Sequence, residues 1–220
     1  GPGFATMDLA EIVGPLGQVH ALERSRRFLD TLEAQAKARG FTQVTAHEID
    51  VVTDPIPVDG ADAAWARWIF AFLPRPKEAL QKLVDALKPG GALVFHEYID
   101  YQTWKLAPPA PNFEKFVDEV SANWRASGGE PDIARLLPSW LTEMGLRIES
   151  LKPYVDVVSK DDNTWRWPIG FFEIHIDRLL ELNRITPQMA KDMREEFARV
   201  SAQPGTLMVT PLVLEIIARK

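Results

Sequence analysis

The chain of 220 residues contains no cysteine and only 4 histidines. Without cysteine it cannot form a disulfide, and no thiolate can ligate a metal ion. The histidines stand far apart in the sequence, and none of them belongs to an HxxxH pair. We therefore expect no metal site.

A surplus of basic residues and a long apolar run are also missing. The formal net charge is −6 and the Lys and Arg residues are scattered, which does not favour binding to a nucleic-acid backbone. No apolar run reaches the roughly 18 residues of a membrane-spanning helix, and no signal peptide is recognisable. We expect a cytoplasmic protein that has no nucleic-acid partner and no membrane partner.

Short apolar segments alternate with amphipathic helices through the first hundred residues. This alternation is typical of a parallel sheet covered on both faces, and the length suits one α/β core, so we expect a single domain over residues 1–220. The pattern predicts strands at 19–23, 44–49, 61–68 and 92–95, and helices at 4–13, 25–39 and 76–87.

The second half departs from this alternation. Helical spacing of apolar residues predicts helices at about 113–124, 133–144, 165–182 and 187–200, and strands at 147–158 and 207–218. Thr186 before Pro187 is a typical helix start. Because long connections in compact domains are usually functional, we expect segments 98–130 and 160–205 to be lid insertions that bind the substrate.

The glycines of Gly1-Pro2-Gly3 are followed by a predicted helix, a strand and Glu23, which stands 20 residues after Gly3. Glycines let a backbone approach a bound nucleoside, and an acid at this interval can accept both ribose hydroxyls. A buried strand normally precedes such a loop. We infer that the sequence begins inside its own first motif; the alternative is that Gly1-Pro2 remains from protease cleavage of a tag.

The order of these parts resembles that of class I S-adenosylmethionine-dependent methyltransferases of the UbiE-like, or type 11, small-molecule group. Lys88-Pro89-Gly90-Gly91 before a strand is the most recognisable match, and Asp62 to Trp68 followed by Phe72-Leu73-Pro74 is similar to the fourth strand of that family and the segment after it. The resemblance implies a Rossmann-like, doubly wound α/β fold. Its seven-stranded sheet is mostly parallel, the last strand is antiparallel, and the first strand would precede Gly1.

The resemblance also implies S-adenosylmethionine as the cofactor. Its methionine part would lie on Gly1 and Gly3, its ribose on Glu23 and its adenine beside Asp50 and Val51, and Arg67 belongs to the segment that lies under the cofactor in this family. A carboxylate suits a sulfonium cofactor better than a pyrophosphate, which favours S-adenosylmethionine over NAD. A nicotinamide-dependent oxidoreductase and a non-catalytic protein that keeps the fold remain alternatives, as do turn or helix-start roles for the two acids.

His96 ends the predicted fifth strand, where a neutral imidazole can accept a proton from a hydroxyl or amine, with Glu97 or Asp100 orienting it. Alternatively, strand alternation places one of His96 and Glu97 in packing, and proximity and orientation alone carry the transfer. Tyr101 and Lys105 have the YxxxK spacing of short-chain dehydrogenases. The prolines that follow make this stretch a poor helix, so we interpret the spacing as a coincidence.

Aromatic residues gather in the two long insertions. Such rings suit a flat or apolar small molecule and exclude water around a methyl group transferred by direct displacement. The alternatives are that these rings only join the lid to the core or form the surface of a homodimer, and that the histidine among them is a core residue. The predicted substrate-binding residues are Tyr98, Trp104, Trp165, Trp167, Phe171 and His175.

Overall fold

The computed structural model describes all 220 residues, which divide into two compact units. The first unit comprises Gly1–Asp62 and Lys77–Gly91, and the second comprises Ala63–Pro76 and Ala92–Lys220. None of the helices combines the length and the apolar character that crossing a membrane requires.

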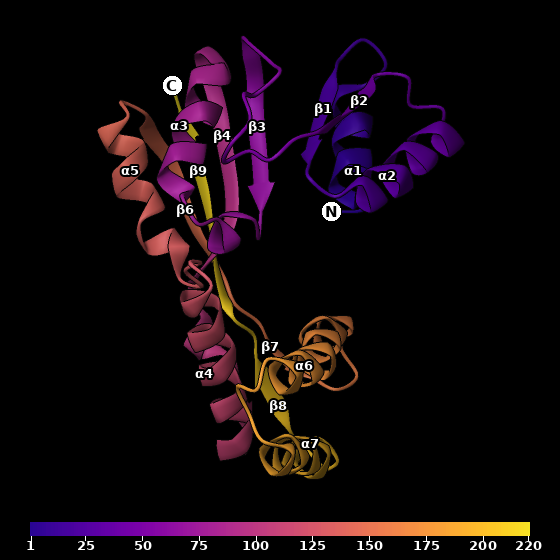
Figure 1. Cartoon of the computed structure of the whole chain (residues 1–220), viewed down its shortest axis with the longest axis vertical. Helices are drawn as coiled ribbons and strands as arrows, with labels where there is room; N and C mark the ends of the chain where they lie inside the picture. Colours follow the sequence, from indigo (N-terminus) through magenta and orange to yellow (C-terminus); the bar gives the residue numbers. More distant parts are fainter. The chain divides into compact units, whose positions relative to one another are not determined.

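The first unit contains a two-stranded parallel sheet and three helices (Figure 1). Its elements are α1 (Phe4–Val13), β1 (Val19–Glu23), α2 (Arg26–Arg39), β2 (Val44–Glu48) and α3 (Pro76–Ala86), of which all but Pro76 belong to this unit. A small core forms where Met7 of α1 meets Leu32 and Ala36 of α2. These bounds confirm the predicted helix over 4–13 and the strand over 19–23.

A glycine at the start of α1 is required by packing as well as by backbone conformation. Gly3 has φ +99°, and a Cβ on it would lie 2.9 Å from Cγ of Leu32. An L side chain there would combine strain with a clash, because only glycine visits this region readily. The glycine turn is therefore held close against α2.

The second unit contains most of a four-stranded sheet and the whole of a three-stranded sheet (Figure 1). The larger sheet has the order β3 (Ala61–Arg67), β4 (Leu87–Asp100), β9 (Leu212–Arg219) and β6 (Arg147–Tyr154). In it β9 is antiparallel to both β4 and β6. The smaller sheet is antiparallel and has the order β5 (Lys105–Ala107), β8 (Leu207–Val209) and β7 (Val157–Ser159).

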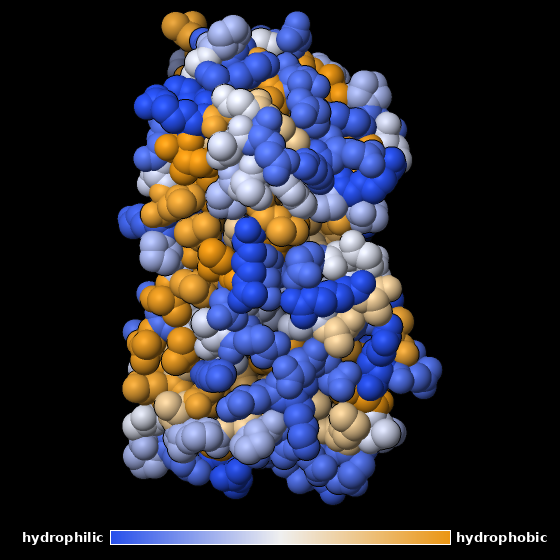
Figure 2. All heavy atoms as spheres, turned by 90° about the vertical axis from the view of Figure 1, so that its left-hand side faces the viewer, coloured by the Kyte–Doolittle hydropathy of each residue, from blue (hydrophilic) through white to orange (hydrophobic).

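Helices α4 (Pro111–Ala126), α6 (Asn163–Glu181) and α7 (Pro187–Ser201) pack together around aromatic side chains, and α5 (Leu137–Glu143) precedes β6. Phe172 is fully buried, and its ring centroid lies 4.7 Å from those of both Phe116 and Phe197. Thr186 caps α7 as predicted, because its side chain accepts a hydrogen bond from the Met189 N–H. Hydrophobic residues also reach the surface, and Figure 2 shows a band of them on one face.

The strands of the second unit correct the sequence prediction. Segments 147–158 and 207–218 were each expected as a single strand, but each forms two strands. The shorter strand of each segment, β7 or β8, joins β5 in the smaller sheet, and β5 itself was not expected. Pro211 has no N–H to donate to a sheet. At the break, the Thr210 N–H donates to the Asp156 carbonyl and the Asp156 N–H donates to the Thr210 hydroxyl, each with an N–O distance of 3.0 Å. The six expected strands that belong to this chain do not form one sheet, since β1 and β2 pair with each other and β3, β4, β9 and β6 form the larger sheet. Residues 88–91, expected to precede a strand, lie within β4.

Candidate active site

The glycine turn and Glu23 come together in the first unit. Glu23 ends β1, and its Oε2 lies beside the backbone nitrogen of Gly1. Its Oε1 accepts a hydrogen bond from the Ser25 N–H at 2.9 Å, while its carbonyl accepts one from the Ile49 N–H at 3.1 Å. The carboxylate at the end of β1 therefore stands beside the glycine turn, as the spacing predicted.

Asp50 follows the neighbouring strand β2 and closes a turn. Its Oδ1 accepts a hydrogen bond from the Val52 N–H at 2.8 Å, and its own N–H donates to Oδ2 of Asp54 at 2.9 Å. Lys82 of α3 donates to the carbonyls of Val52 and Asp54 at 2.7 and 2.9 Å and fixes this turn from outside. Asp50 thus has the turn-forming role given above as the alternative. A contact of Asp50 or Val51 with a cofactor stays a prediction.

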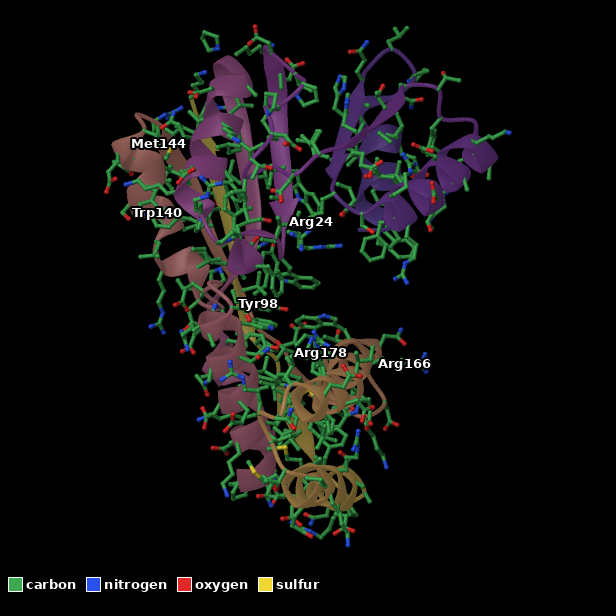
Figure 3. All side chains as sticks on the ribbon, in the orientation of Figure 1. Arg24, Tyr98, Trp140, Met144, Arg166 and Arg178 are labelled. Carbon is green, nitrogen blue, oxygen red and sulfur yellow. The ribbon has the colours of Figure 1, made fainter.

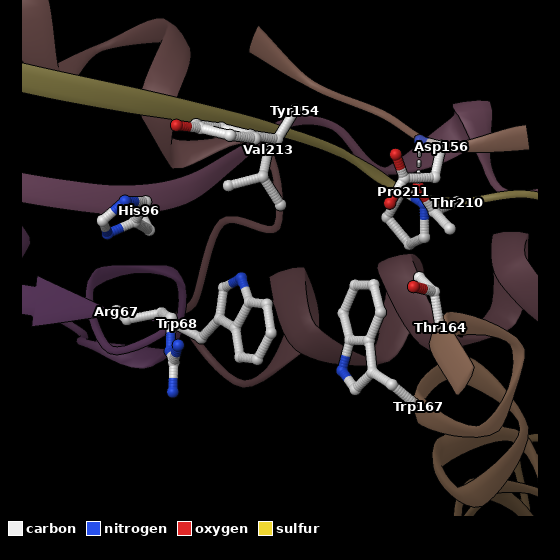
Figure 4. A pocket seen from close by; sticks show the side chains of 10 residues that line it. All are labelled: Arg67, Trp68, His96, Tyr154, Asp156, Thr164, Trp167, Thr210, Pro211 and Val213. Atoms are coloured by element: carbon white, nitrogen blue, oxygen red, sulfur yellow. Dashed lines mark hydrogen bonds between the residues drawn. The ribbon is translucent and has the colours of Figure 1, made fainter. Parts of the chain in front are cut away.

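The second unit contains a cavity of about 370 Å³ (Figure 4). Three of the residues predicted for the site line it: Arg67 from the end of β3, His96 from β4 and Trp167 from α6. The full lining consists of Arg67, Trp68, His96, Tyr154, Asp156, Thr164, Trp167, Thr210, Pro211 and Val213. A second cavity, of only about 10 Å³, is lined by Tyr98, Tyr101, Trp104, Trp167, Pro168, Phe171 and Pro211.

Stacked aromatic rings form one wall of the larger cavity. The Trp68 ring is parallel to that of Trp167 within 2° at a centroid distance of 4.9 Å, and to that of Tyr98 within 8° at 5.7 Å. Tyr98, labelled in Figure 3, comes from β4. The Arg67 guanidinium carbon lies 5.2 Å from the ring centroids of both Trp65 and Trp68. Trp68 and Trp167 thus line the cavity as a stacked pair, and Tyr98 and Trp65 pack against this pair and Arg67 outside the lining.

Trp68 has a backbone conformation that tryptophan rarely adopts, with φ +53°. The backbone N–H of Trp68 donates to the His96 carbonyl at 3.1 Å. The backbone N–H groups of the next two residues, Ile69 and Phe70, donate to Oε1 of Glu97 at 2.8 and 2.9 Å. Strained residues persist where the surroundings fix them. The buried Glu97 carboxyl therefore holds the turn that presents Trp68 to the cavity.

Glu97 has no accessible surface, and this burial raises its pKa to about 7 in spite of the hydrogen bonds from backbone N–H groups. Successive residues of a strand point to opposite faces, so Glu97 and His96 are directed to different sides of β4. Glu97 is the packed member of the pair, as the sequence alternative allowed, and it also accepts hydrogen bonds from backbone N–H groups. Glu97 does not orient His96.

The partner of His96 is Glu215 on β9, so the expectation of Glu97 or Asp100 was wrong. His96 Nε2 lies 2.9 Å from Oε2 of Glu215, which also accepts a hydrogen bond from the Tyr154 hydroxyl at 3.3 Å. The antiparallel register pairs His96 directly with Glu215. Asp100 instead accepts a hydrogen bond from the Gln102 N–H, in the turn after β4.

The other predicted substrate-binding residues lie mainly in the aromatic core. Trp104 is 1% exposed and donates through Nε1 to the Met208 sulfur at 3.3 Å, and Trp165 is also buried. The His175 ring stacks on Phe171 at 3.5 Å, and burial lowers the pKa of this histidine. None of Trp104, Trp165 and His175 lines the larger cavity, which agrees with the alternative that these rings join the insertions to the core.

The YxxxK spacing does not lie on a helix of the dehydrogenase kind. Tyr101 begins a short 3-10 turn that ends at Thr103, and Lys105 begins β5. Tyr101 is fully packed among other rings, and its burial raises the pKa of its hydroxyl. The interpretation as a coincidence is consistent with this geometry.

Part of the chain resembles known methyltransferases. Residues 1–95 match the family model described as a methyltransferase domain of type 11. The fold is shared with a solved S-adenosylmethionine-dependent methyltransferase of Mesorhizobium loti, at a TM-score of 0.55 and 18% identity over 100% of this chain and 87% of that one. The chain thus shares the α/β fold of that structure, and the match of residues 1–95 agrees with the resemblance stated from the sequence.

Two relatives are similar in sequence. One is the demethylmenaquinone methyltransferase of Anoxybacillus flavithermus, 34% identical over 89 residues, or 40% of this chain. The other is the aklanonic acid methyltransferase DauC of a Streptomyces species, 25% identical over 145 residues, or 64% of this chain. The matched parts span 38% and 64% of the length of these relatives.

Proposed function

We propose that the protein transfers a methyl group from S-adenosylmethionine to a small, flat molecule by direct displacement. One observation carries this proposal: the Glu23 carboxylate stands beside the glycine turn, within the part of the chain that matches the methyltransferase domain. S-adenosylmethionine supplies the methyl group.

The residues of the first unit fit this cofactor. The turn at Gly3 has no room for a side chain, and the carboxylate at the end of β1 can accept hydrogen bonds from two ribose hydroxyls. Gly1 and Gly3 would hold the methionine part, Glu23 the ribose, and Asp50 with Val51 the adenine. A contact of Arg67 with the cofactor stays a prediction from the sequence.

The acceptor is proposed to bind in the larger cavity of the second unit. Its stacked rings offer a flat, apolar wall, with Trp167 36% exposed and available for contact. Tyr98 and Phe171 would pack against this wall. Trp104, Trp165 and His175 would hold it in place from the aromatic core and would not touch the acceptor. His96 is the proposed base. The names of the two relatives, which specify demethylmenaquinone and aklanonic acid, support a small-molecule acceptor.

Calorimetry with S-adenosylmethionine and with NADH tests the cofactor. We expect S-adenosylmethionine to bind, and we expect Glu23→Ala to weaken it. Glu48→Ala is the matched control, because Glu48 ends the neighbouring strand and is paired with Glu23 in the sheet register. Binding of NADH without binding of S-adenosylmethionine would overturn the proposal, and a screen with isotopically labelled methyl groups then identifies the acceptor.

The finer features of the class are part of the same proposal. We infer lid functions for segments 98–130 and 160–205. The packing of α4, α6 and α7 around one aromatic core supports these lid functions. A cytoplasmic location, a homodimer and the absence of a nucleic-acid partner remain predictions from the sequence, and sedimentation analysis tests the homodimer.

A further inference from the structure

Arg67 is the only Lys or Arg side chain among the residues that line the larger cavity of the second unit. It is exposed, and it makes no ion pair with any of the 220 residues. Its guanidinium carbon lies 5.2 Å from the ring centroids of both Trp65 and Trp68. Because stacking on rings occupies the faces of a guanidinium, the N–H groups at its edge stay free to donate. The cavity thus has an accessible cation that two indoles orient and that lacks a counter-ion.

The carboxylates of this region do not neutralise Arg67. Oε2 of Glu215 lies 2.9 Å from Nε2 of His96 and accepts a hydrogen bond from the Tyr154 hydroxyl at 3.3 Å. Asp156 lines the same cavity, and Figure 4 shows Arg67 at one end of it and Asp156 at the other. An anionic group is attracted by the guanidinium and repelled by the carboxylate. The two charges therefore favour one orientation of an anionic ligand, with its charged end at Arg67.

The turn that follows Arg67 is strained. Trp68 has φ +53°, and the turn is held by the N–H groups of Ile69 and Phe70, which donate to Oε1 of Glu97. Strained residues cluster at ligand-binding sites, where the surrounding structure fixes them. The strain next to Arg67 therefore supports a ligand at this end of the cavity.

We propose that Arg67 binds the carboxylate of an apolar small molecule that occupies the larger cavity. A planar guanidinium matches a carboxylate and can donate to both of its oxygens. The cavity of about 370 Å³ is lined elsewhere by Pro211, Val213 and aromatic rings, which suit an apolar body. This inference rests on the proposed function and names the class of its acceptor, an apolar monocarboxylic acid.

Two probes of the same shape isolate the charged contact. 2-Naphthoate carries a carboxylate where 2-naphthamide carries a neutral amide. In ligand-observed NMR titrations of the 220-residue protein, 2-naphthoate should bind about threefold to tenfold more tightly, because hydrogen bonds to charged groups contribute more than neutral ones. This preference should decrease as added salt screens the exposed guanidinium. Equal affinity for the two probes, or no binding of either at millimolar concentration, would overturn the inference.

Variants assign the preference to its residue. Arg67→Gln should make the two affinities equal, and Arg67→Lys should keep only part of the preference, because an ammonium lacks the planar fork of donors. Arg166→Gln is the matched control. Arg166 is an exposed arginine of α6 that does not line the cavity (Figure 3), so its replacement should leave the preference unchanged. A full preference in Arg67→Gln would overturn the assignment, and if that variant does not fold, a full preference in Arg67→Lys would do so.

The carboxylate has two possible sources, the acceptor and the methionine part of S-adenosylmethionine. If the acceptor supplies it, saturating S-adenosylmethionine should leave the Kd of 2-naphthoate unchanged, and Arg67→Gln should bind S-adenosylmethionine as wild type does. Displacement of 2-naphthoate by S-adenosylmethionine, with weaker cofactor binding in Arg67→Gln, would overturn the assignment to the acceptor.

The outcome for the proposed function is separate. A carboxylate preference that depends on Arg67, in a protein that does not bind S-adenosylmethionine, would support the carboxylate site while refuting the proposed function. Binding of S-adenosylmethionine by a protein without any carboxylate preference would refute the site while supporting the proposed function.

Discussion

Replacement of Glu97 by Gln should change how the stability of the protein depends on pH. In the folded protein the pKa of this carboxyl is raised to about 7, from the 4.5 that is ordinary for a glutamate. The cause is first the burial of the group, opposed by hydrogen bonds from backbone N–H groups of Ile69, Phe70 and Ala71. At one pKa unit per 1.36 kcal/mol, the shift amounts to about 3 kcal/mol.

The direction in which the free energy of unfolding changes with pH depends on whether the folded or the unfolded state holds the proton. Between pH 4.5 and about 7 the folded state keeps it and the unfolded state releases it, so the stabilisation from the neutral carboxyl is fully present below pH 4.5 and is lost as pH rises to about 7. Glutamine is neutral at every pH and keeps an oxygen that accepts from Ile69 and Phe70. The free energy of unfolding of the Gln variant should therefore rise relative to wild type by about 3 kcal/mol between pH 4.5 and pH 8.

Urea unfolding followed by tryptophan fluorescence, repeated across this pH range, measures the difference. Asp118→Asn, at an exposed carboxylate on α4, is the control and should show no such trend. A difference between Gln variant and wild type that stays constant with pH would refute the reasoning, because the carboxyl would then titrate normally in the folded protein.

Three further changes test the cofactor turn, the cavity and the core. Glu23→Ala should weaken S-adenosylmethionine by about 1.5–3 kcal/mol in calorimetry, because hydrogen bonds to a charged group are lost, and unchanged affinity would mean that the carboxylate does not touch the ribose. Trp167→Ala should raise the KM for the acceptor and leave cofactor affinity nearly unchanged; an equal loss of both together with a lower Tm would make the ring structural. Phe172→Ala should lower the free energy of unfolding by about 3–5 kcal/mol in urea titrations, and a loss below 1 kcal/mol would contradict its packing between Phe116 and Phe197.

Local patterns predicted the elements well where short-range chemistry determines them. The bounds of α1 and β1 and the cap of α7 depend on glycine, apolar spacing and Thr186, all of which are visible within a few residues. The contact between the glycine turn and Glu23 was predictable because one helix and one strand connect them.

Contacts over long sequence separations were not predictable in the same way. Glu215 stands 119 residues after His96, and only the register between β4 and β9 brings the two together. A shift of one residue would turn Glu215 to the other face, and the sequence alone does not set the register. Trp68 belonged to a predicted strand, and its positive φ depends on the carboxyl of Glu97, 29 residues later.

The position of β9 has a consequence for the order in which the molecule assembles. β4 and β6 each pair with β9 and not with one another. The larger sheet therefore stays incomplete until Leu212–Arg219 has been synthesised. The helices α4, α6 and α7 come earlier along the chain. Because all three helices have been synthesised before Leu212–Arg219, we expect them to pack together first during synthesis. The pair of His96 and Glu215 would then be among the last features to form, and a nascent chain would be folded in part before it could act.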